Sequence, residues 1–326
     1  MSHSTDRSTA RRSWFSSRRK SVLLPAGVGM VACAALIVPI TVPRELSQRT
    51  GIELSGAVWS PVLSRYVLVS DDVNEEEAKH EPLLFTLSES GQLDAAPIRI
   101  EGIAELNDPE SITAGPDGTL FVCTSHSVNK KGHLPESRRR LLQLAVGADR
   151  QVKVLGQLDL SVARGTDGKP PWGAGSLDIE GIAFRDGALY IGLKSPLAGD
   201  GSAVILRLPN VVVSIQSGVV QDGALAPWSR SRFCVPHDGK SVCEGIADLA
   251  FLPDGSLLIT ANAPKGMPSD GGGSLWKLAA PNSAPTLLKR FEGLKPEGVA
   301  LAPDHTTAIV VFDTDGRQPL WIRWPL

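Results

Sequence analysis

Residues 180–193 read Glu-Gly-Ile-Ala-Phe-Arg-Asp-Gly-Ala-Leu-Tyr-Ile-Gly-Leu, and this stretch decides the fold. A short apolar segment leads into Asp186-Gly187, a pair whose backbone preferences suit a tight turn. A second apolar segment, containing aromatic and β-branched residues, follows at once. Two such segments on either side of Asp-Gly predict a β-hairpin.

The same plan occurs five times along the chain, and outer fourth strands are visible at residues 98–100, 152–155, 231–235 and 286–289. A third strand follows each hairpin. Four antiparallel strands in each repeat are typical of a propeller blade. The sequence therefore predicts a single all-β propeller of five four-stranded blades, whose first strands begin at Ser55, Glu110, Glu180, Glu244 and Glu297.

Two alternatives to five blades stay open. One is a sixth blade hidden in the insertions, where no apolar alternation is visible, and the other is a β-sandwich with accidental turn repeats. The last repeat ends at Leu326 after three strands. We expect residues 47–53 to supply its outer strand and close the ring, because closure removes exposed sheet edges.

Charge is unevenly distributed along the chain. The 326 residues carry a formal net charge of −2, yet residues 1–20 hold six basic residues against Asp6. The body that follows is acidic, which gives no electrostatic basis for binding nucleic acid. With 42% hydrophobic residues, the composition suits a folded domain.

An uncharged apolar run over residues 21–43 follows the basic head, as in an export signal or a membrane anchor. The interpretations are an uncleaved anchor, cleavage at Ala32-Cys33-Ala34, a lipoprotein-like box at residues 30–33 and a twin-arginine signal. We expect a basic disordered N-terminus over 1–20, a signal or membrane anchor over 21–43, and an extracytoplasmic propeller over 44–326.

Two of the four cysteines, Cys234 and Cys243, are nine residues apart and flank a Pro-His-Asp-Gly-Lys turn. Outside the cytoplasm this spacing permits a local disulfide. The alternative is two unpaired thiols. A zinc site is less favoured, because His237 is the only histidine near them in the sequence.

Four of the five repeats begin with a glutamate, at Glu110, Glu180, Glu244 and Glu297. In a propeller these strands line the central channel, so we predict a ring of carboxylates at its mouth. Carboxylates so close together raise one another's pKa and favour a bound cation. Calcium is the expected ion, because it takes several oxygen ligands in an adaptable geometry. The alternative is structural, with each glutamate accepting backbone N–H groups and joining adjacent blades.

Polar residues directly after the second strands should surround the same mouth: Asp71, Ser125, Lys194, Asn262 and Asp313. Beside them His126 is the candidate catalytic base, because the unperturbed pKa of histidine is near neutrality. The alternative is a histidine that only makes hydrogen bonds. The insertion over 126–140 is basic, which predicts a solvated loop or, alternatively, attraction of an anionic ligand.

Residues 180–197, with Asn107-Asp-Pro-Glu-Ser-Ile and Thr124-Ser-His-Ser, resemble an uncharacterised bacterial propeller family, domain of unknown function 3616. Lys194-Ser195 and Ser111 depart from its pattern, which has Arg-Gly and Gly there. The Glu-Gly-Ile-Ala repeat is more distantly similar to phytase-related esterase-like propellers. That distant resemblance implies a divalent ion and hydrolysis at the channel mouth, whereas the closer one implies no activity.

Two functions are consistent with these features. The first is an exported, metal-dependent hydrolase of an ester, a lactone or a phosphoester. The second is a non-catalytic extracytoplasmic scaffold that binds a small molecule, an anionic ligand or a protein at the same mouth. In either case we expect a monomer that contacts the membrane only through its N-terminal segment.

Overall fold

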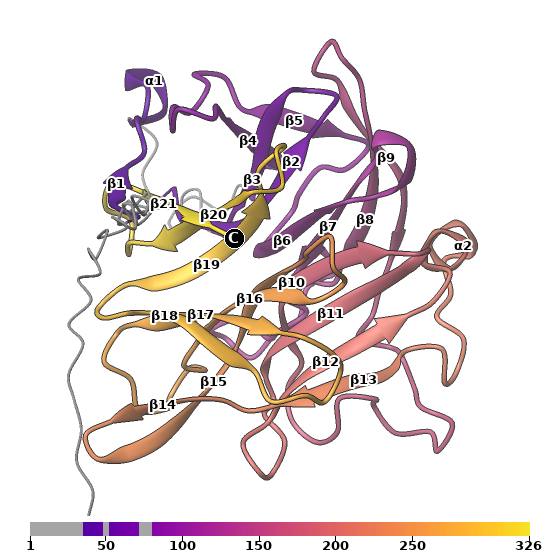
Figure 1. Ribbon diagram of the computed structural model, residues 1–326. Helices are drawn as coiled ribbons and strands as arrows, with labels where there is room; N and C mark the ends of the chain where they lie inside the picture. The colour runs from indigo at the N-terminus through magenta and orange to yellow at the C-terminus, as the bar shows by residue number, and fades with distance from the viewer. Residues whose placement is uncertain (1–34, 48–51, 72–79) are drawn as a thin grey trace, which may run out of the picture. The chain divides into compact units, whose positions relative to one another are not determined.

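The structure is a computed structural model that describes residues 35–47, 52–71 and 80–326 (Figure 1). The described chain is mainly β-strand, with two short helices, α1 (Arg44–Ser47) and α2 (Val211–Ser217). Two 3-10 turns lie at Pro116–Gly118 and Glu136–Arg138. The strands fall into five groups of four that are antiparallel within each group.

The first group contains β2 (Leu54–Ser60), β3 (Arg65–Ser70), β4 (Leu83–Leu87) and β5 (Ile98–Glu101). The second contains β6 (Pro109–Ala114), β7 (Leu120–Thr124), β8 (Leu141–Val146) and β9 (Val152–Leu158). The third contains β10 (Asp178–Arg185), β11 (Ala188–Ser195), β12 (Ala203–Leu208) and β13 (Ala226–Ser231). The fourth contains β15 (Lys240–Phe251), β16 (Leu257–Asn262), β17 (Gly273–Leu278) and β18 (Thr286–Phe291), extended by β14 (Phe233–His237). The fifth contains β19 (Lys295–Leu301), β20 (Thr307–Asp313), β21 (Leu320–Pro325) and β1 (Ile37–Pro39).

The innermost strands of the five groups form a closed ring. Each packs against the innermost strand of the next group, in the order β2, β6, β10, β15 and β19, and β19 packs against β2. This arrangement is the propeller-like all-β fold that the repeats predicted. The backbones approach so closely that a Cβ atom on Gly56 would lie 2.8 Å from Ser111 Cα. A Cβ atom on Gly181 would lie 2.9 Å from Asp248 Cα. Glycine is therefore required at both positions for steric reasons.

Five apolar cores lie between neighbouring groups, and each group contributes to two of them. In β7, Phe121 and Cys123 face the core shared with the third group, whereas Leu120 and Val122 face the core shared with the first. All four side chains are buried. Burying one large aliphatic side chain contributes about 1.5–3 kcal/mol, so these cores hold the groups together. Burial on both faces explains why these strands are apolar throughout instead of alternating.

The ring is closed by a segment that the sequence assigned elsewhere. β1 pairs antiparallel with β21, with Ile37 opposite Ile322, and supplies the outer strand expected from residues 47–53. The buried side chain of Ile40 follows it in the core. The propeller therefore begins before residue 44, inside the run over 21–43 that was assigned to a signal or anchor. A short apolar run suits a strand and a signal equally well, so its pattern could not separate them.

The remainder of the predicted head and signal or anchor, residues 1–34, lies outside the described residues. Within the residues that the structure does describe, we find no helix that is both long enough and apolar enough to cross a bilayer.

Two pairings between strands differ from the predicted pattern. The outer strands β5 and β9 pair in parallel, with Ile100 opposite Val152, and join the first two groups into one sheet. The outer strand of the third group is β13, which begins five residues before the outer strand predicted over 231–235. Residues predicted to form that outer strand instead form β14, a hairpin partner of β15 in which Cys234 is opposite, and disulfide-bonded to, Cys243.

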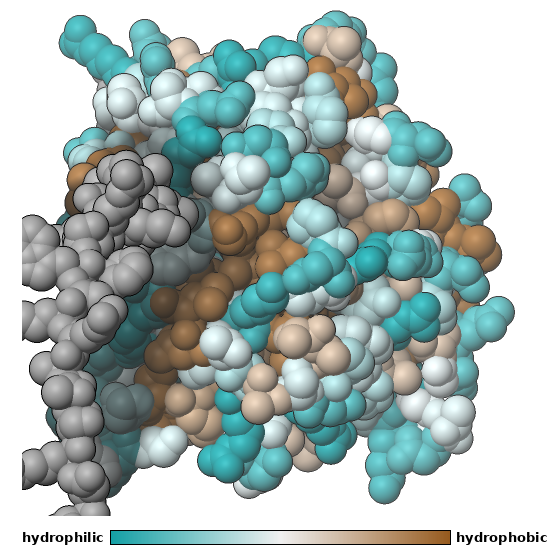
Figure 2. All heavy atoms as spheres, viewed as in Figure 1, coloured by the Kyte–Doolittle hydropathy of each residue, from teal (hydrophilic) through white to brown (hydrophobic). Residues whose placement is uncertain are grey.

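The two ends of the inner strands differ in chemistry. Their starts carry carboxylates, described below, whereas their far ends line a hollow of about 500 Å³ with apolar side chains that include Trp59, Phe184 and Phe251. Figure 2 shows that apolar residues reach the surface mainly in a band across the middle of that view, with hydrophilic residues around it.

Asp248 joins three of the five groups near the axis. Its side chain is 1% exposed, and its carboxylate accepts hydrogen bonds from the backbone N–H groups of Leu249 (2.8 Å) and Val299 (2.9 Å). A third bond comes from the N–H of Ala57. Burial raises the pKa of Asp248 well above its ordinary value, although these donors counteract it. One side chain thus connects β15 with β19 and β2.

We predict that Asp248→Ala lowers the free energy of unfolding by about 3 kcal/mol or more, because it leaves three buried N–H groups without an acceptor. Urea denaturation would measure this loss. Asp222→Ala, on an exposed loop, is the control and should change stability by less than about 0.5 kcal/mol. Equal effects of the two substitutions would contradict the role given to Asp248.

Candidate functional site

Three of the four predicted glutamates lie at β-bulges where the inner strands begin. The strand pairing skips one position around Glu110 and around Glu180, and Glu297 lies in a similar shift of register. Bulges redirect single side chains and are common beside functional sites. Burial raises the pKa of Glu110 and of Glu297, and the charge of Glu180 adds to both shifts. These three glutamates are the part of the predicted ring that the structure assembles.

Glu244 does not belong to this ring, so its assignment is corrected. The bulge in β15 falls between Ile246 and Asp248, and Ala247 therefore occupies the equivalent position. The sequence contained a signal for this offset: the turn aspartate follows Glu110 and Glu297 by seven positions but follows Glu244 by ten. The pKa of Glu244 is raised to about 7 by burial, against the effects of Ser274 and Arg290.

The carboxylate of Glu244 is bound within its own group of strands. It accepts hydrogen bonds from the hydroxyl of Ser274 and from Arg290 Nη1, the latter at 2.6 Å. The same guanidinium donates to Asp270 Oδ1 at 2.6 Å. Glu244 is thus a structural residue whose charge is balanced by arginine.

One half of the mouth is organised around a buried lysine at the end of β11. Lys194 Nζ lies 2.7 Å from Glu180 Oε2 and 3.8 Å from Glu297 Oε2. Burial alone would lower the pKa of Lys194, but Glu180 and Glu297 reverse this effect and raise it. Asn262 Nδ2 donates to Glu297 Oε1 at 3.0 Å. Lys194 therefore neutralises part of the ring, as its position in the sequence predicted.

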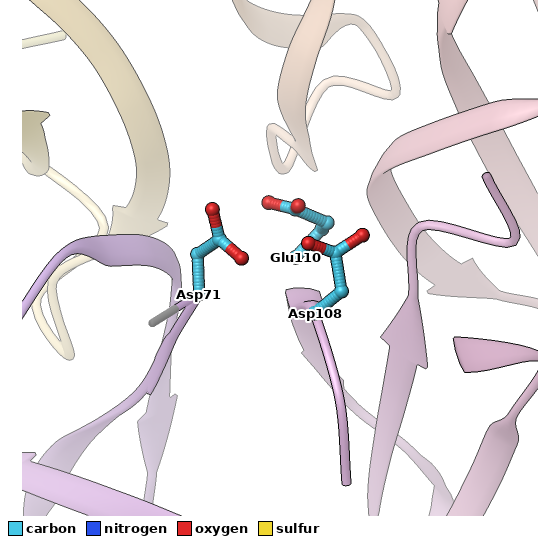
Figure 3. A group of neighbouring side chains, drawn as sticks. All are labelled: Asp71, Asp108 and Glu110. Carbon is cyan, nitrogen blue, oxygen red and sulfur yellow. The ribbon is translucent and has the colours of Figure 1, made fainter. Parts of the chain in front are cut away.

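The other half of the mouth is a cluster of three carboxylates. Figure 3 shows the side chains of Asp71, Asp108 and Glu110 pointing toward a shared space. One oxygen from each lies within 4.8 Å of the others, a spacing from which all three can bind one metal ion. Burial, followed by the charges of Asp71 and Glu180, raises the pKa of Glu110 well above its ordinary value. A cation in this space would relieve that repulsion.

Local structure fixes Asp108 at the cluster. Its backbone is left-handed, with φ of 60°, and the N–H of Ser125 donates to its carbonyl oxygen at 3.0 Å. Its carboxylate accepts hydrogen bonds from the Ser125 hydroxyl and from Arg138. Ser125, from the second predicted ring, therefore orients a carboxylate of the cluster.

Sequence reasoning missed Asp108 and Asp178, both of which precede a ring glutamate by two positions. The repeated pattern Asp-x-Glu at 108–110 and 178–180 was the available signal, because it sets a second carboxylate close in sequence to each glutamate at the start of an inner strand. Burial and then Glu180 raise the pKa of Asp178 to about 7, against the opposing charge of Lys194. The electrostatic environment of Asp178 thus includes Glu180 and Lys194 from the lysine half and Asp108 from the cluster.

The remaining member of the second predicted ring lies at its rim. Asp313 Oδ2 accepts a hydrogen bond from Lys295 Nζ at 2.9 Å, and its charge contributes to the raised pKa of Glu297. All five predicted residues after the second strands are thus linked, directly or through one neighbour, to the ring glutamates or the cluster.

His126 does not face the mouth as a base, which corrects the catalytic assignment. Nδ1 lies 2.8 Å from the carbonyl oxygen of Thr124, and Nε2 accepts the N–H of Leu160 at 3.2 Å. The side chain is buried, and burial lowers its pKa to about 4. Both ring nitrogens are occupied by backbone groups, so His126 is a structural residue that joins two loops.

The arginines of the basic insertion are bound internally. Arg138 donates to Asp108, Arg139 Nη1 donates to Asp159 Oδ2 at 2.8 Å, and Arg140 donates to the carbonyl oxygen of Glu105 at 3.0 Å. These guanidinium groups stabilise the 126–140 segment against its neighbours. The alternative that the basic insertion attracts an anionic ligand stays a prediction.

Comparisons with known proteins leave the family open. No family model matches the chain, and no curated protein matches it. The resemblance to domain of unknown function 3616 therefore stays a prediction.

Solved structures with a similar outline include a gluconolactonase from Xanthomonas campestris, 12% identical over 90% of each chain with a TM-score of 0.45. Another is a luciferin-regenerating enzyme, 13% identical over 90% of this chain and 96% of that one, with a TM-score of 0.41. A third is the glutaminyl cyclase of Myxococcus xanthus, 12% identical over 88% of this chain and 93% of that one, with a TM-score of 0.44. All three TM-scores are below 0.5, so these structures assign no role to any residue of this chain. Its propeller-like fold follows from its own strand order.

We predict that the metal-free protein loses stability as pH rises from 5 to 8. The folded-state pKa of Asp178 and of Glu297 is raised to about 7, so folding favours their protonated forms. That contribution is complete below their unfolded pKa values near 4 and is lost as pH rises through 7. Each group should account for about 1–3 kcal/mol.

Urea denaturation in chelator at several pH values would measure this slope. Asp178→Asn should flatten it, whereas the exposed-loop variant Asp222→Asn should leave it unchanged. An identical slope in Asp178→Asn and the wild type would contradict the raised pKa.

Proposed function

We propose that this protein binds a divalent cation, calcium in the first instance, at its channel mouth and hydrolyses an ester, a lactone or a phosphoester there. The observation that supports the proposal most directly is the convergence of Asp71, Asp108 and Glu110, whose carboxylate oxygens lie within 4.8 Å of one another. All three donors are hard oxygen ligands, which suit calcium better than a softer metal such as zinc.

A divalent ion held by these carboxylates would polarise a substrate carbonyl or phosphoryl oxygen and lower the pKa of a bound water. The chain's own residues would supply the rest. Asp178, whose electrostatic environment includes Asp108 of the cluster, takes the place of His126 as the group that accepts a proton. Lys194 and Asn262 hold Glu180 and Glu297 in fixed orientations on the opposite side. Arg138 and Ser125 fix Asp108.

The charges at the mouth favour an uncharged substrate over a phosphoester. Six carboxylates surround the opening, from Asp71, Asp108, Glu110, Asp178, Glu180 and Glu297. Arg138 is bonded to Asp108 and Lys194 to Glu180, so both cations are already engaged with carboxylates. One divalent ion would still leave the mouth acidic, and a phosphate dianion would be repelled. We therefore place esters and lactones ahead of phosphoesters.

The alternative is a cation-dependent binding scaffold without catalysis. The hydrogen bonds that hold Asp108 and Glu297 in place favour the scaffold, because a rigid site suits binding as well as chemistry. The two functions share the cation and differ in turnover.

We predict that millimolar calcium raises the melting temperature over that in chelator, and that Glu110→Gln abolishes the rise. A ligand at a hundredfold excess over its dissociation constant adds about 2.7 kcal/mol to stability. Glu244→Gln is the matched control: it removes a buried glutamate outside the cluster and should keep the calcium effect. Calorimetry in both variants would measure the affinity.

A calcium effect that survives Glu110→Gln, or none in the wild type, would contradict the site. Turnover is tested separately with 4-nitrophenyl acetate, a simple γ-lactone and 4-nitrophenyl phosphate. Ester or lactone hydrolysis that is lost in chelator and restored by calcium supports the hydrolase. Calcium binding with no turnover of any of the three supports the scaffold.

We also propose that the chain is exported, with the propeller outside the cytoplasm. The basic head before an apolar run and the hairpin disulfide support this location. Mass spectrometry of unreduced peptides from the native host should show Cys234 linked to Cys243. Free thiols at both positions in freshly isolated protein would argue against export. Closing so short a loop should stabilise the fold by about 2–3 kcal/mol.

A further inference from the structure

Lys194 lies where the sequence predicted a metal ion. Its side chain is 9% exposed and extends between two glutamates of different inner strands, Glu180 on β10 and Glu297 on β19. Asp178 also contributes to its electrostatic environment. A buried ammonium among several carboxylates carries out the charge compensation that a bound cation would provide.

The ring is thereby divided into two parts of different chemistry. Glu180 and Glu297 have a cation that belongs to the protein itself. Glu110 lies instead beside Asp71 and Asp108, and the charges that act most strongly on it are those of carboxylates. Within this group Arg138 binds Asp108 and also donates to the carbonyl oxygen of Ser127 at 3.1 Å.

We propose that Lys194 is a positioning residue that acts as a built-in counter-cation and confines the mouth to one divalent ion, held by Asp71, Asp108 and Glu110. This inference rests on the cation site proposed above. Without the ammonium, Glu180 and Glu297 would stand as two adjacent carboxylates with Asp178 beside them. That group is itself a set of hard oxygen ligands, so it would accept a second divalent ion.

The experiment is calcium titration of the wild type and of Lys194→Met by isothermal calorimetry, with melting temperatures recorded in chelator and in calcium. The wild type should bind one ion per chain and Lys194→Met two. The melting temperature of the variant should fall in chelator and recover in millimolar calcium, because the ion replaces the lost ammonium. Stoichiometry and recovery are readouts that a purely structural lysine would not produce.

Two controls separate charge from packing. Lys295→Met removes the half-exposed lysine paired with Asp313 at the rim and should leave the stoichiometry at one. Lys194→Met combined with Glu297→Gln removes one charge of each sign, and its stoichiometry should return to one because the second site loses a ligand. The expected number of bound calcium ions is therefore one for the wild type, two for Lys194→Met, and one for each of the two controls.

Each outcome decides between the two proposals. A wild type that binds no calcium overturns the cation site itself. A wild type with one ion and a Lys194→Met variant with one ion overturn the role of Lys194 and leave the site intact. A variant that folds only when calcium is present supports the proposal, since calcium then substitutes for the lysine. A variant that fails to fold in both conditions counts against it.

Discussion

The close contact of five inner strands around one axis is the constraint on which the rest of the structure depends. At Gly56 and Gly181 the backbones of neighbouring strands leave no room for a side chain. Asp248 lies at one of these contacts, and its carboxylate binds backbone N–H groups of three inner strands. The other carboxylates near the axis lie at the strand starts, where bulges let side chains diverge.

Those bulges connect the fold to the candidate site. A regular strand would direct Glu110 and Glu180 according to simple alternation, but an extra residue at each strand start turns the side chain toward the opening. The same irregularity gives Asp108 and Asp178 a place beside them. Ring closure then brings residues from separate repeats within a few ångströms of one another.

The mouth balances its charge in two ways. On one side Lys194 compensates Glu180 and Glu297, and its hydrogen bond makes that half resemble a stable buried ion pair. On the other side three carboxylates converge, and burial, followed by the charges of Asp71 and Glu180, raises the pKa of Glu110. The two halves thus balance their charges with different partners, Lys194 in one and Arg138 in the other.

The sequence by itself determined the repeated four-strand plan, because Asp-Gly turns between apolar segments are local signals that need no knowledge of distant residues. It also indicated that Glu110, Glu180, Glu297 and Lys194 share one end of the repeats, since equivalent positions in a ring meet around its axis.

Three other features could be established only from the tertiary structure. Residues 37–39, rather than 47–53, close the ring, because an apolar run pairs with whichever open edge lies near it. Ala247, rather than Glu244, takes the inward position, because a three-residue offset in register moved the glutamate toward Arg290. His126 became a structural residue because its left-handed backbone, with φ of 56°, directs the imidazole to backbone partners. Register and side-chain direction depend on contacts far apart in the sequence, and local patterns do not encode them.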